Sequence, residues 1–117
     1  EKDTLTAFLS VKRGSGKFEK FKLSIPKQGT IHLTGTGDLF AALFMAHSTN
    51  LNDDLGKALE LTIASIQSTI ETTLNSMPED LRSGKVAASA QKREIKIIQS
   101  KKHFENPEIK LKAIRVE

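Results

Sequence analysis

Two threonines, two glycines and an acid lie next to one another at residues 34–38, immediately before the apolar run 39–46. Glycine permits backbone angles that are closed to other residues and lets a ligand approach the chain closely. A helix that begins here directs unpaired N–H groups and the positive end of its dipole at the turn, which favours an anion such as phosphate. The carboxylate of Asp38 can accept a proton from an attacking hydroxyl. An anion site beside a base is what phosphoryl transfer to an alcohol requires.

The same residues are also compatible with an ordinary loop that leads into a helix, in which Asp38 only complements the helix dipole. Short glycine motifs occur by chance, so the surrounding sequence decides between the two interpretations. A short strand predicted over 31–33 leads into the turn, which is the context that a phosphate site requires. A second glycine segment, at 14–17, is not a Walker-type loop, because Val11 and Phe18 stand where that motif needs glycine and a hydroxyl residue.

An antiparallel hairpin is predicted before the glycine turn. Residues 4–11 and 18–25 are rich in residues that suit strands, and the turn between them contains two glycines. In the second strand, Phe21, Leu23 and Ile25 alternate with polar residues, which is typical of a strand with one buried face.

Two long helices are predicted next. The first, over 38–47, is apolar nearly all round, which indicates burial and makes Phe44 and Met45 core residues. The second begins after the capping residues at 52–54 and ends before Pro78. Its apolar residues recur three and four positions apart and form one packing face: Leu55, Leu59, Ile63, Ile66, Ile70 and Leu74.

The remaining third of the chain has weaker signals. Residues 79–89 are polar and predict a surface loop. A third helix is predicted over 90–102, with Ile95 and Ile98 facing inward. Apolar residues alternate with lysines at 109–113, which predicts an edge strand shielded by charge.

Composition limits the classes of function. The 117 residues are enough for one small domain or for part of a larger one. The net charge of +4 comes without tyrosine or tryptophan to stack on bases, so the lysines are interpreted as solvated surface and nucleic acid is not expected as a partner. There is no cysteine, no apolar run of membrane-spanning length and no metal-binding histidine motif, and no membrane partner or protein-held metal is expected.

Residues 35–42, Gly-Thr-Gly-Asp-Leu-Phe-Ala-Ala, resemble the signature of the pyridoxal kinases within the ribokinase-like superfamily. Residues 94–101, followed by Asn106 and Pro107, resemble that family's C-terminal helix and its exit. The spacing of the two blocks also fits, so the resemblance covers nearly the whole chain. It implies an α/β fold: the C-terminal part of a ribokinase-like three-layer sandwich, in which residues 1–117 form the C-terminal segment of a single kinase domain and the N-terminal portion is absent.

The resemblance also implies an activity: ATP-dependent phosphorylation of the 5′-hydroxymethyl group of pyridoxal, pyridoxine or pyridoxamine. Asp38 corresponds to the general base and, with Gly35, to a substrate contact. The amides of Gly35, Thr36 and Gly37 correspond to the anion hole, and Thr36 and Gly35 to contacts with the nucleotide phosphates. The adenine side of the nucleotide corresponds to three further positions: Thr30, Ile31 and Ile70.

The partners implied are ATP with Mg²⁺, a B6 vitamer and the remainder of the same kinase. A monovalent cation is a further candidate, the intact enzyme is expected to be a cytoplasmic homodimer, and the isolated segment is expected to be inactive. Two alternatives stay open at this point. One is a related kinase for another hydroxymethyl compound or a sugar, and the other is a noncatalytic nucleotide-binding module.

Overall fold

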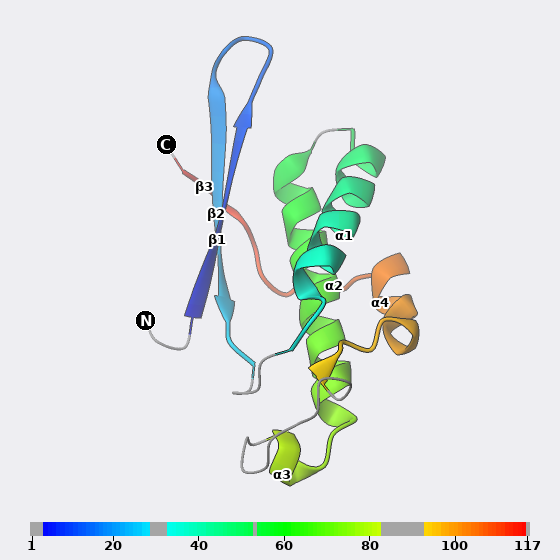
Figure 1. The fold of residues 1–117 in the computed structure, drawn as a ribbon. Coiled ribbons are helices and arrows are strands. Elements are labelled where there is room, and N and C mark those ends of the chain that lie inside the picture. The colour runs from blue at the N-terminus through cyan, green and yellow to red at the C-terminus, as the bar shows by residue number, and fades with distance from the viewer. Residues whose placement is uncertain (1–3, 29–32, 53, 83–92, 117) are drawn as a thin grey trace.

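The computed structural model describes residues 4–28, 33–52, 54–82 and 93–116. They form a small antiparallel sheet covered on one face by helices (Figure 1). In chain order the elements are β1 (Thr4–Lys12), β2 (Phe18–Pro26), α1 (Thr36–Asn50), α2 (Leu55–Asn75), α3 (Glu79–Arg82), the 3₁₀ turn η2 (Ile98–Ser100), α4 (Lys101–Glu105) and β3 (Ile114–Val116).

The predicted hairpin is confirmed. Strands β1 and β2 pair antiparallel along their whole length, with Ala7 opposite Leu23, and β3 pairs with the other edge of β2. The alternation of β2 puts Leu23 in the core, half-buries Phe21 and leaves Lys20 and Lys22 in solvent. The period of two in this strand therefore separates the helix-facing side of the sheet from the open side.

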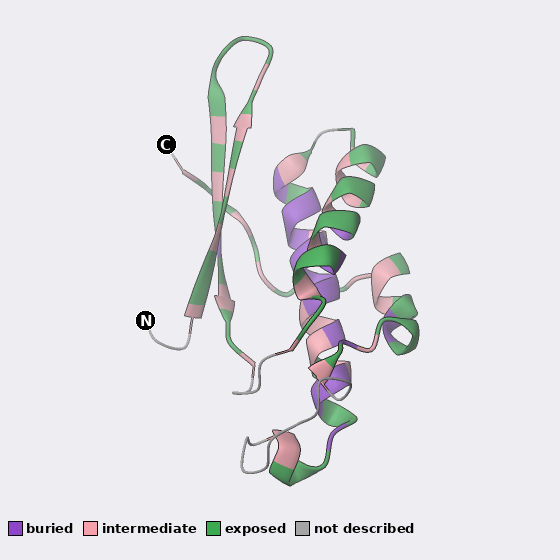
Figure 2. Ribbon diagram, in the orientation of Figure 1, coloured by how far each residue is buried: buried purple, intermediate pink, exposed green. Residues whose placement is uncertain are grey.

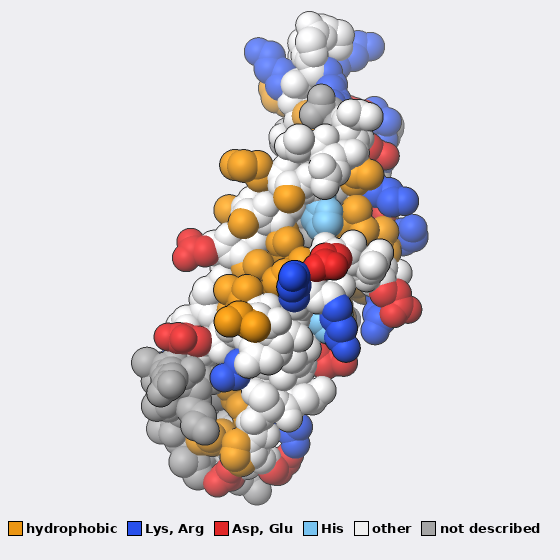
Figure 3. Space-filling model, turned by 90° about the vertical axis from the view of Figure 1, so that its right-hand side faces the viewer, with side chains coloured by type: hydrophobic (Ala, Val, Ile, Leu, Met, Phe, Trp, Pro, Cys, Tyr) orange, Lys and Arg blue, Asp and Glu red, His pale blue; other side chains and the backbone are white. Residues whose placement is uncertain are grey.

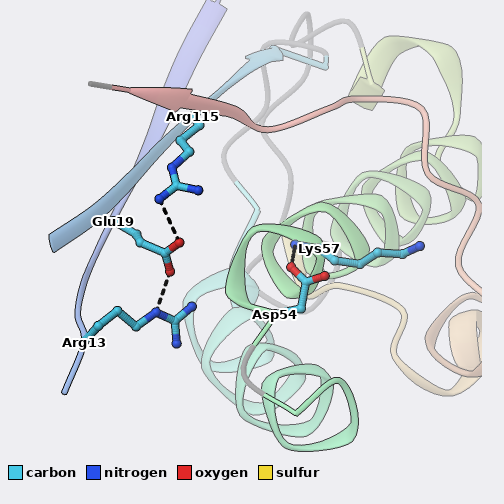
Figure 4. Close-up of polar contacts among 5 residues, drawn as sticks. All are labelled: Arg13, Glu19, Asp54, Lys57 and Arg115. Atoms are coloured by element: carbon cyan, nitrogen blue, oxygen red, sulfur yellow. Dashed lines mark hydrogen bonds and ion pairs between the residues drawn. The ribbon is translucent and has the colours of Figure 1, made fainter. Parts of the chain in front are cut away.

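A carboxylate ties the hairpin to the last strand. Glu19 of β2 pairs with Arg13, which follows β1, and its other oxygen lies 3.0 Å from an Nη atom of Arg115 in β3 (Figure 4). The Glu19 side chain is largely shielded from solvent, whereas that of Arg115 is 65% exposed. The pair joins strands that are distant in sequence, but its partly exposed position limits its contribution to stability to about 1 kcal/mol or less.

Helix α2 is the most buried element of the molecule (Figure 2). Its predicted start and its apolar face are confirmed: the helix follows Asp54, and Leu59 and Ile63 pack with Leu23 of the sheet. The helix approaches the sheet closely at Gly56, where an added Cβ would lie 2.9 Å from the ring of Phe21.

Helix α1 is longer and less buried than the sequence predicts. It begins at Thr36 rather than Asp38, and its buried residues are Leu39 and Leu43. Phe44 packs partly into the core, but Met45 is 71% exposed, so the prediction that it is a core residue is wrong for this chain. Helix α2 covers one side of α1, and among the described residues the other side of α1 remains on the surface, where apolar side chains gather (Figure 3).

The prediction of a helix over 90–102 is wrong at residues 94–97 and right at 98–102, where η2 and the start of α4 lie. Residues 90–92 lie outside the described residues. Glu94 forms an isolated parallel bridge with Thr34, in which the carbonyl of Arg93 and the N–H of Ile95 bond to Thr34 instead of within a helix. After this bridge, helical structure follows at η2 and α4. Ile95 is buried as predicted, whereas Ile98 is 87% exposed.

The predictions for residues 79–89 and 109–113 were partly right. Residues 79–82, predicted as loop, form α3, and 83–89 lie outside the described residues. The edge strand exists, but it begins at Ile114, after the predicted 109–113. The physical reason is that the N–H of Ala113 donates to the carboxylate of Glu60 in α2 at 2.7 Å, so helix side chains hold the segment before β3.

The predicted strand at 31–33 is mostly untested, because 31 and 32 lie outside the described residues. Leu33 itself has no strand structure, and Thr34 forms the isolated bridge with Glu94. Within the described part of the chain, no helix is both long and apolar enough to cross a bilayer.

Candidate functional site

The glycine turn forms an open helix N-terminus. Gly35 is the N-cap residue of α1 and has a φ of 98°, in the left-handed region that favours glycine. The first helical hydrogen bond runs from the N–H of Leu39 to the carbonyl of Gly35, at 3.1 Å. The N–H groups of Thr36, Gly37 and Asp38 precede it and have no carbonyl to bond within the helix. No side chain in the described residues caps this end, so its amides are available to an anion.

The turn is accessible from solvent. Gly35, Gly37 and Asp38 are exposed, and Thr36 is half-buried. A cavity of about 280 Å³ is lined by residues 94–99, which include Glu94, the bridge partner of Thr34. The amides and the carboxylate therefore lie together on an open surface, within four residues of one another.

A segment almost sixty residues away in the sequence holds the turn. Thr34 donates its N–H to the carbonyl of Arg93 at 2.8 Å, and its carbonyl accepts the N–H of Ile95 at 3.2 Å. The Ile95 side chain packs beside Gly35, where an added Cβ would lie 3.2 Å from Cγ1 of Ile95. Both the backbone pairing and this side chain therefore define the conformation of Gly35.

Of the three residues predicted on the adenine side, only Ile70 is placed. It is half-buried on α2 and packs against the cluster that also contains Leu39 and Ile95, so it lies in the same core as the start of α1. Thr30 and Ile31 lie outside the described residues.

The chain just before the undescribed residues 29–32 lies against α2. The side-chain amide of Gln28 donates to the carbonyl of Gln67 at 3.0 Å, and the amide of Gln67 donates to the carbonyl of Pro26 at 3.3 Å. Around this contact is a polar cavity of about 150 Å³, which Glu71 also lines. The exit of β2 thus meets the turn of α2 that carries Ile70.

Sequence reasoning missed the residues that support the turn. Thr73 of α2 is fully buried, and its hydroxyl accepts the N–H of Lys96 at 2.9 Å. A usable signal exists, because hydroxyl residues recur at helical spacing on the buried side of α2: Thr62, Ser65, Thr69 and Thr73. Small polar residues at that spacing indicate a face that contacts backbone instead of apolar side chains.

A shifted pKa occurs at the other end of α1, away from the glycine turn. Burial lowers the pKa of His47 from its usual 6.5, at the opposite end of α1. The described residues contain no group of three or more histidine, aspartate or glutamate side chains that could hold a metal ion.

No protein-family model matches the chain. Over 99 residues it is 36% identical to a pyridoxal kinase of Arabidopsis thaliana, an alignment that covers 85% of this chain and 30% of that protein. It is 31% identical over 100 residues to the pyridoxal kinase of Homo sapiens, covering 86% of this chain and 31% of the relative. The chain therefore spans about 30% of the length of these curated relatives.

Solved structures show the same likeness. The chain superposes on a pyridoxal kinase from Leishmania donovani in complex with ADP, with a TM-score of 0.78 and 22% identity over 98% of this chain and 36% of that one. The Plasmodium falciparum enzyme with ligands AMP-PNP and PL gives a TM-score of 0.71 and 20% identity over 99% of this chain and 34% of that one. These matches confirm the α/β fold, and the matches in sequence confirm the resemblance to pyridoxal kinases.

Proposed function

We propose that this chain, whose sequence and fold resemble those of pyridoxal kinases over most of its length, is the C-terminal segment of such a kinase. The activity proposed for the intact enzyme is transfer of the γ-phosphoryl group of ATP to the 5′-hydroxymethyl group of a B6 vitamer. The observation that supports it most is the uncapped, exposed N-terminus of α1, with Asp38 in its first turn.

In the proposed reaction, the vitamer hydroxyl oxygen attacks the γ-phosphorus, and the bond between that phosphorus and the β–γ bridging oxygen breaks, which releases ADP. Asp38 accepts the hydroxyl proton as the new P–O bond forms. The backbone N–H groups of Gly35, Thr36 and Gly37 stabilise the charge on the moving phosphoryl oxygens. Because these amides are fixed before the reaction, little reorganisation accompanies the charge movement.

The same turn contributes to nucleotide binding in this proposal. Thr36 and Gly35 contact the phosphates, and Thr30, Ile31 and Ile70 contact the adenine. The hydrogen bond from Gln28 to α2 supports the adenine assignment, because it brings the chain that precedes residue 29 to the turn of α2 that carries Ile70. Mg²⁺ would be held mainly by the nucleotide phosphates and water, and would neutralise phosphate charge.

The remaining parts of the proposal concern the intact enzyme. The vitamer pocket is assigned mainly to the remainder of the kinase, so the isolated segment is expected to be inactive. We also propose a cytoplasmic homodimer with a site for a monovalent cation. The open face of α1, on which Met45 is exposed, is consistent with further protein covering this side.

The test is a transfer assay on the intact protein. Pyridoxal, pyridoxine and pyridoxamine are each incubated with γ-labelled ATP and Mg²⁺, and label is followed into the vitamer, with a reaction lacking acceptor as the control for ATP hydrolysis. Label in at least one vitamer supports the proposal. Label only in sugars or other hydroxymethyl acceptors would replace the substrate class, and ATP binding without transfer to any acceptor would identify a noncatalytic module.

A further inference from the structure

Buried hydroxyls of α2 make two kinds of hydrogen bond. Three threonines donate to the carbonyl one turn earlier, each at 2.8 Å: Thr62, Thr69 and Thr73. Such bonds stay within the helix and satisfy a hydroxyl that is removed from water. Thr73 differs, because its oxygen also accepts the backbone N–H of Lys96 at 2.9 Å. It therefore connects α2 to the segment that pairs with the glycine turn.

This connection leads to Gly35 in two further contacts. Ile95, next to Lys96, donates its N–H to the carbonyl of Thr34, and its side chain packs beside Gly35. A displacement of residues 93–96 would therefore move the carbonyl that precedes Gly35 and remove the side chain packed against it. The left-handed angle of Gly35 sets where the first amides of α1 point.

We propose that Thr73 is a positioning residue for the anion-binding turn, acting through residues 93–96 and touching neither nucleotide nor acceptor. The inference rests on the proposed function, because it assigns a role in phosphoryl transfer to the amides at Gly35–Gly37. Helix α2 also carries Ile70, the proposed adenine contact, three residues before Thr73. One helix would then define the position of the adenine and of the phosphoryl group relative to each other.

The first test is kinetic and uses the intact kinase. Thr73→Val keeps the shape of the side chain but removes the acceptor for the Lys96 N–H, and Thr73→Ser keeps that acceptor. Thr62→Val is the matched control, because Thr62 is equally buried on the same helix and its hydroxyl bonds to the carbonyl of Ala58. We expect kcat to fall roughly 10-fold to 100-fold in Thr73→Val, as for a displacement of about 1 Å in a reacting site. Thr73→Ser and Thr62→Val should stay within about threefold of wild type, with the KM for the vitamer little changed in all three.

The second test does not depend on activity. Amide hydrogen exchange is measured at Thr34 and Ile95, whose own acceptors are intact in every variant. Exchange at both should be faster in Thr73→Val and unchanged in Thr62→Val. If Thr73→Val does not fold, Ile95→Val replaces it: the loss of one methyl group beside Gly35 should give a smaller fall in kcat of the same kind.

The outcomes separate the two proposals. Faster exchange at Thr34 and Ile95 in Thr73→Val, together with an intact wild-type protein that phosphorylates no acceptor, would support the mechanical connection and overturn the proposed function. Unchanged exchange in Thr73→Val, or an equal loss of kcat in Thr62→Val, would overturn the positioning role while leaving the kinase proposal standing.

Discussion

The two long helices begin in opposite ways. At α2, the side chain of Asp54 accepts the N–H of Lys57 at 3.3 Å, so the helix end is capped by its own sequence (Figure 4). At α1, Gly35 takes the capping position with a left-handed backbone and contributes no side chain. A capping side chain satisfies amides that an anion would otherwise bind. The side-chain cap of α2 stabilises the fold, whereas the first amides of α1 have no capping side chain among the described residues, as the proposed phosphate site requires.

The largest effect is expected when Asn replaces Asp38 in the intact kinase, and the same replacement at Asp54 is the control. Asp38→Asn removes the proposed base, and kcat should fall by about 10²–10⁴ while the affinity for ADP changes little. Asp54→Asn should alter neither quantity, because Asn caps helices about as well as Asp. The measurements are steady-state kinetics and calorimetric titration with ADP. An Asp38→Asn enzyme with near-normal kcat would remove the carboxylate from the mechanism.

The second largest effect is expected from alanine substitutions at the glycines of the turn, and it should differ between Gly35 and Gly37. Gly35→Ala places a Cβ at a left-handed φ and 3.2 Å from Ile95, so we expect a loss of about 1–3 kcal/mol in the free energy of unfolding, together with reduced kcat. Gly37→Ala meets nothing within 4 Å, and an alanine in the helix should stabilise it by up to about 1 kcal/mol.

The kinetics of Gly37→Ala sharpen this comparison, because the protein variant keeps its fold. A lower kcat in a variant that is no less stable would show that a phosphoryl group approaches the chain closely at Gly37. Chemical denaturation and steady-state kinetics on the same preparations supply both numbers. Equal stability of the two alanine variants would contradict the strained conformation of Gly35.

Local signals predicted the parts of the fold whose partners are near in sequence. The alternation around Leu23 predicted β2, and Asp54 with the apolar stripe that follows predicted α2. The segment at Glu94 was predicted as helix because its apolar spacing suits one, but its backbone bonds to Thr34, sixty residues earlier. No local pattern reports a pairing of that range.

The candidate site, too, was predicted from the sequence only in part. The motif from Gly35 to Asp38 predicted a turn at a helix start, and the structure has one there, which is exposed at Gly35, Gly37 and Asp38. The support beneath it could not be predicted, because Thr73 and Lys96 are joined by a single hydrogen bond between segments with no shared sequence pattern. The catalytic and binding roles themselves stay predictions. Exposure of Met45 was missed because composition indicates that a helix is apolar, but not which of its faces another element covers.

A smaller effect is expected from removing the cap of α2. Asp54→Ala leaves the N–H of Lys57 without its acceptor, and the free energy of unfolding should fall by about 1 kcal/mol. The kcat of the intact kinase should not change, since this end of α2 holds no proposed ligand contact. Thermal unfolding and kinetics test both statements. A marked loss of kcat would show that the two helix starts are not independent.

The smallest effect concerns the other end of α1, where His47 lies in the last turn and its Nε2 is buried without a hydrogen-bond partner among the described residues. Burial lowers the pKa of His47 from 6.5, which outweighs the attraction of a helix C-terminus for positive charge. The unfolded chain therefore binds this proton more tightly than the folded one. The contribution to stability is complete above pH 6.5 and is lost as the pH falls from 6.5 through the folded pKa. His47→Gln should remove the fall in Tm that His47 causes between about pH 7.5 and about pH 5. The difference in Tm between wild type and variant cancels the contributions of the other titrating groups. Parallel Tm curves for the two proteins would show that His47 titrates alike in both states.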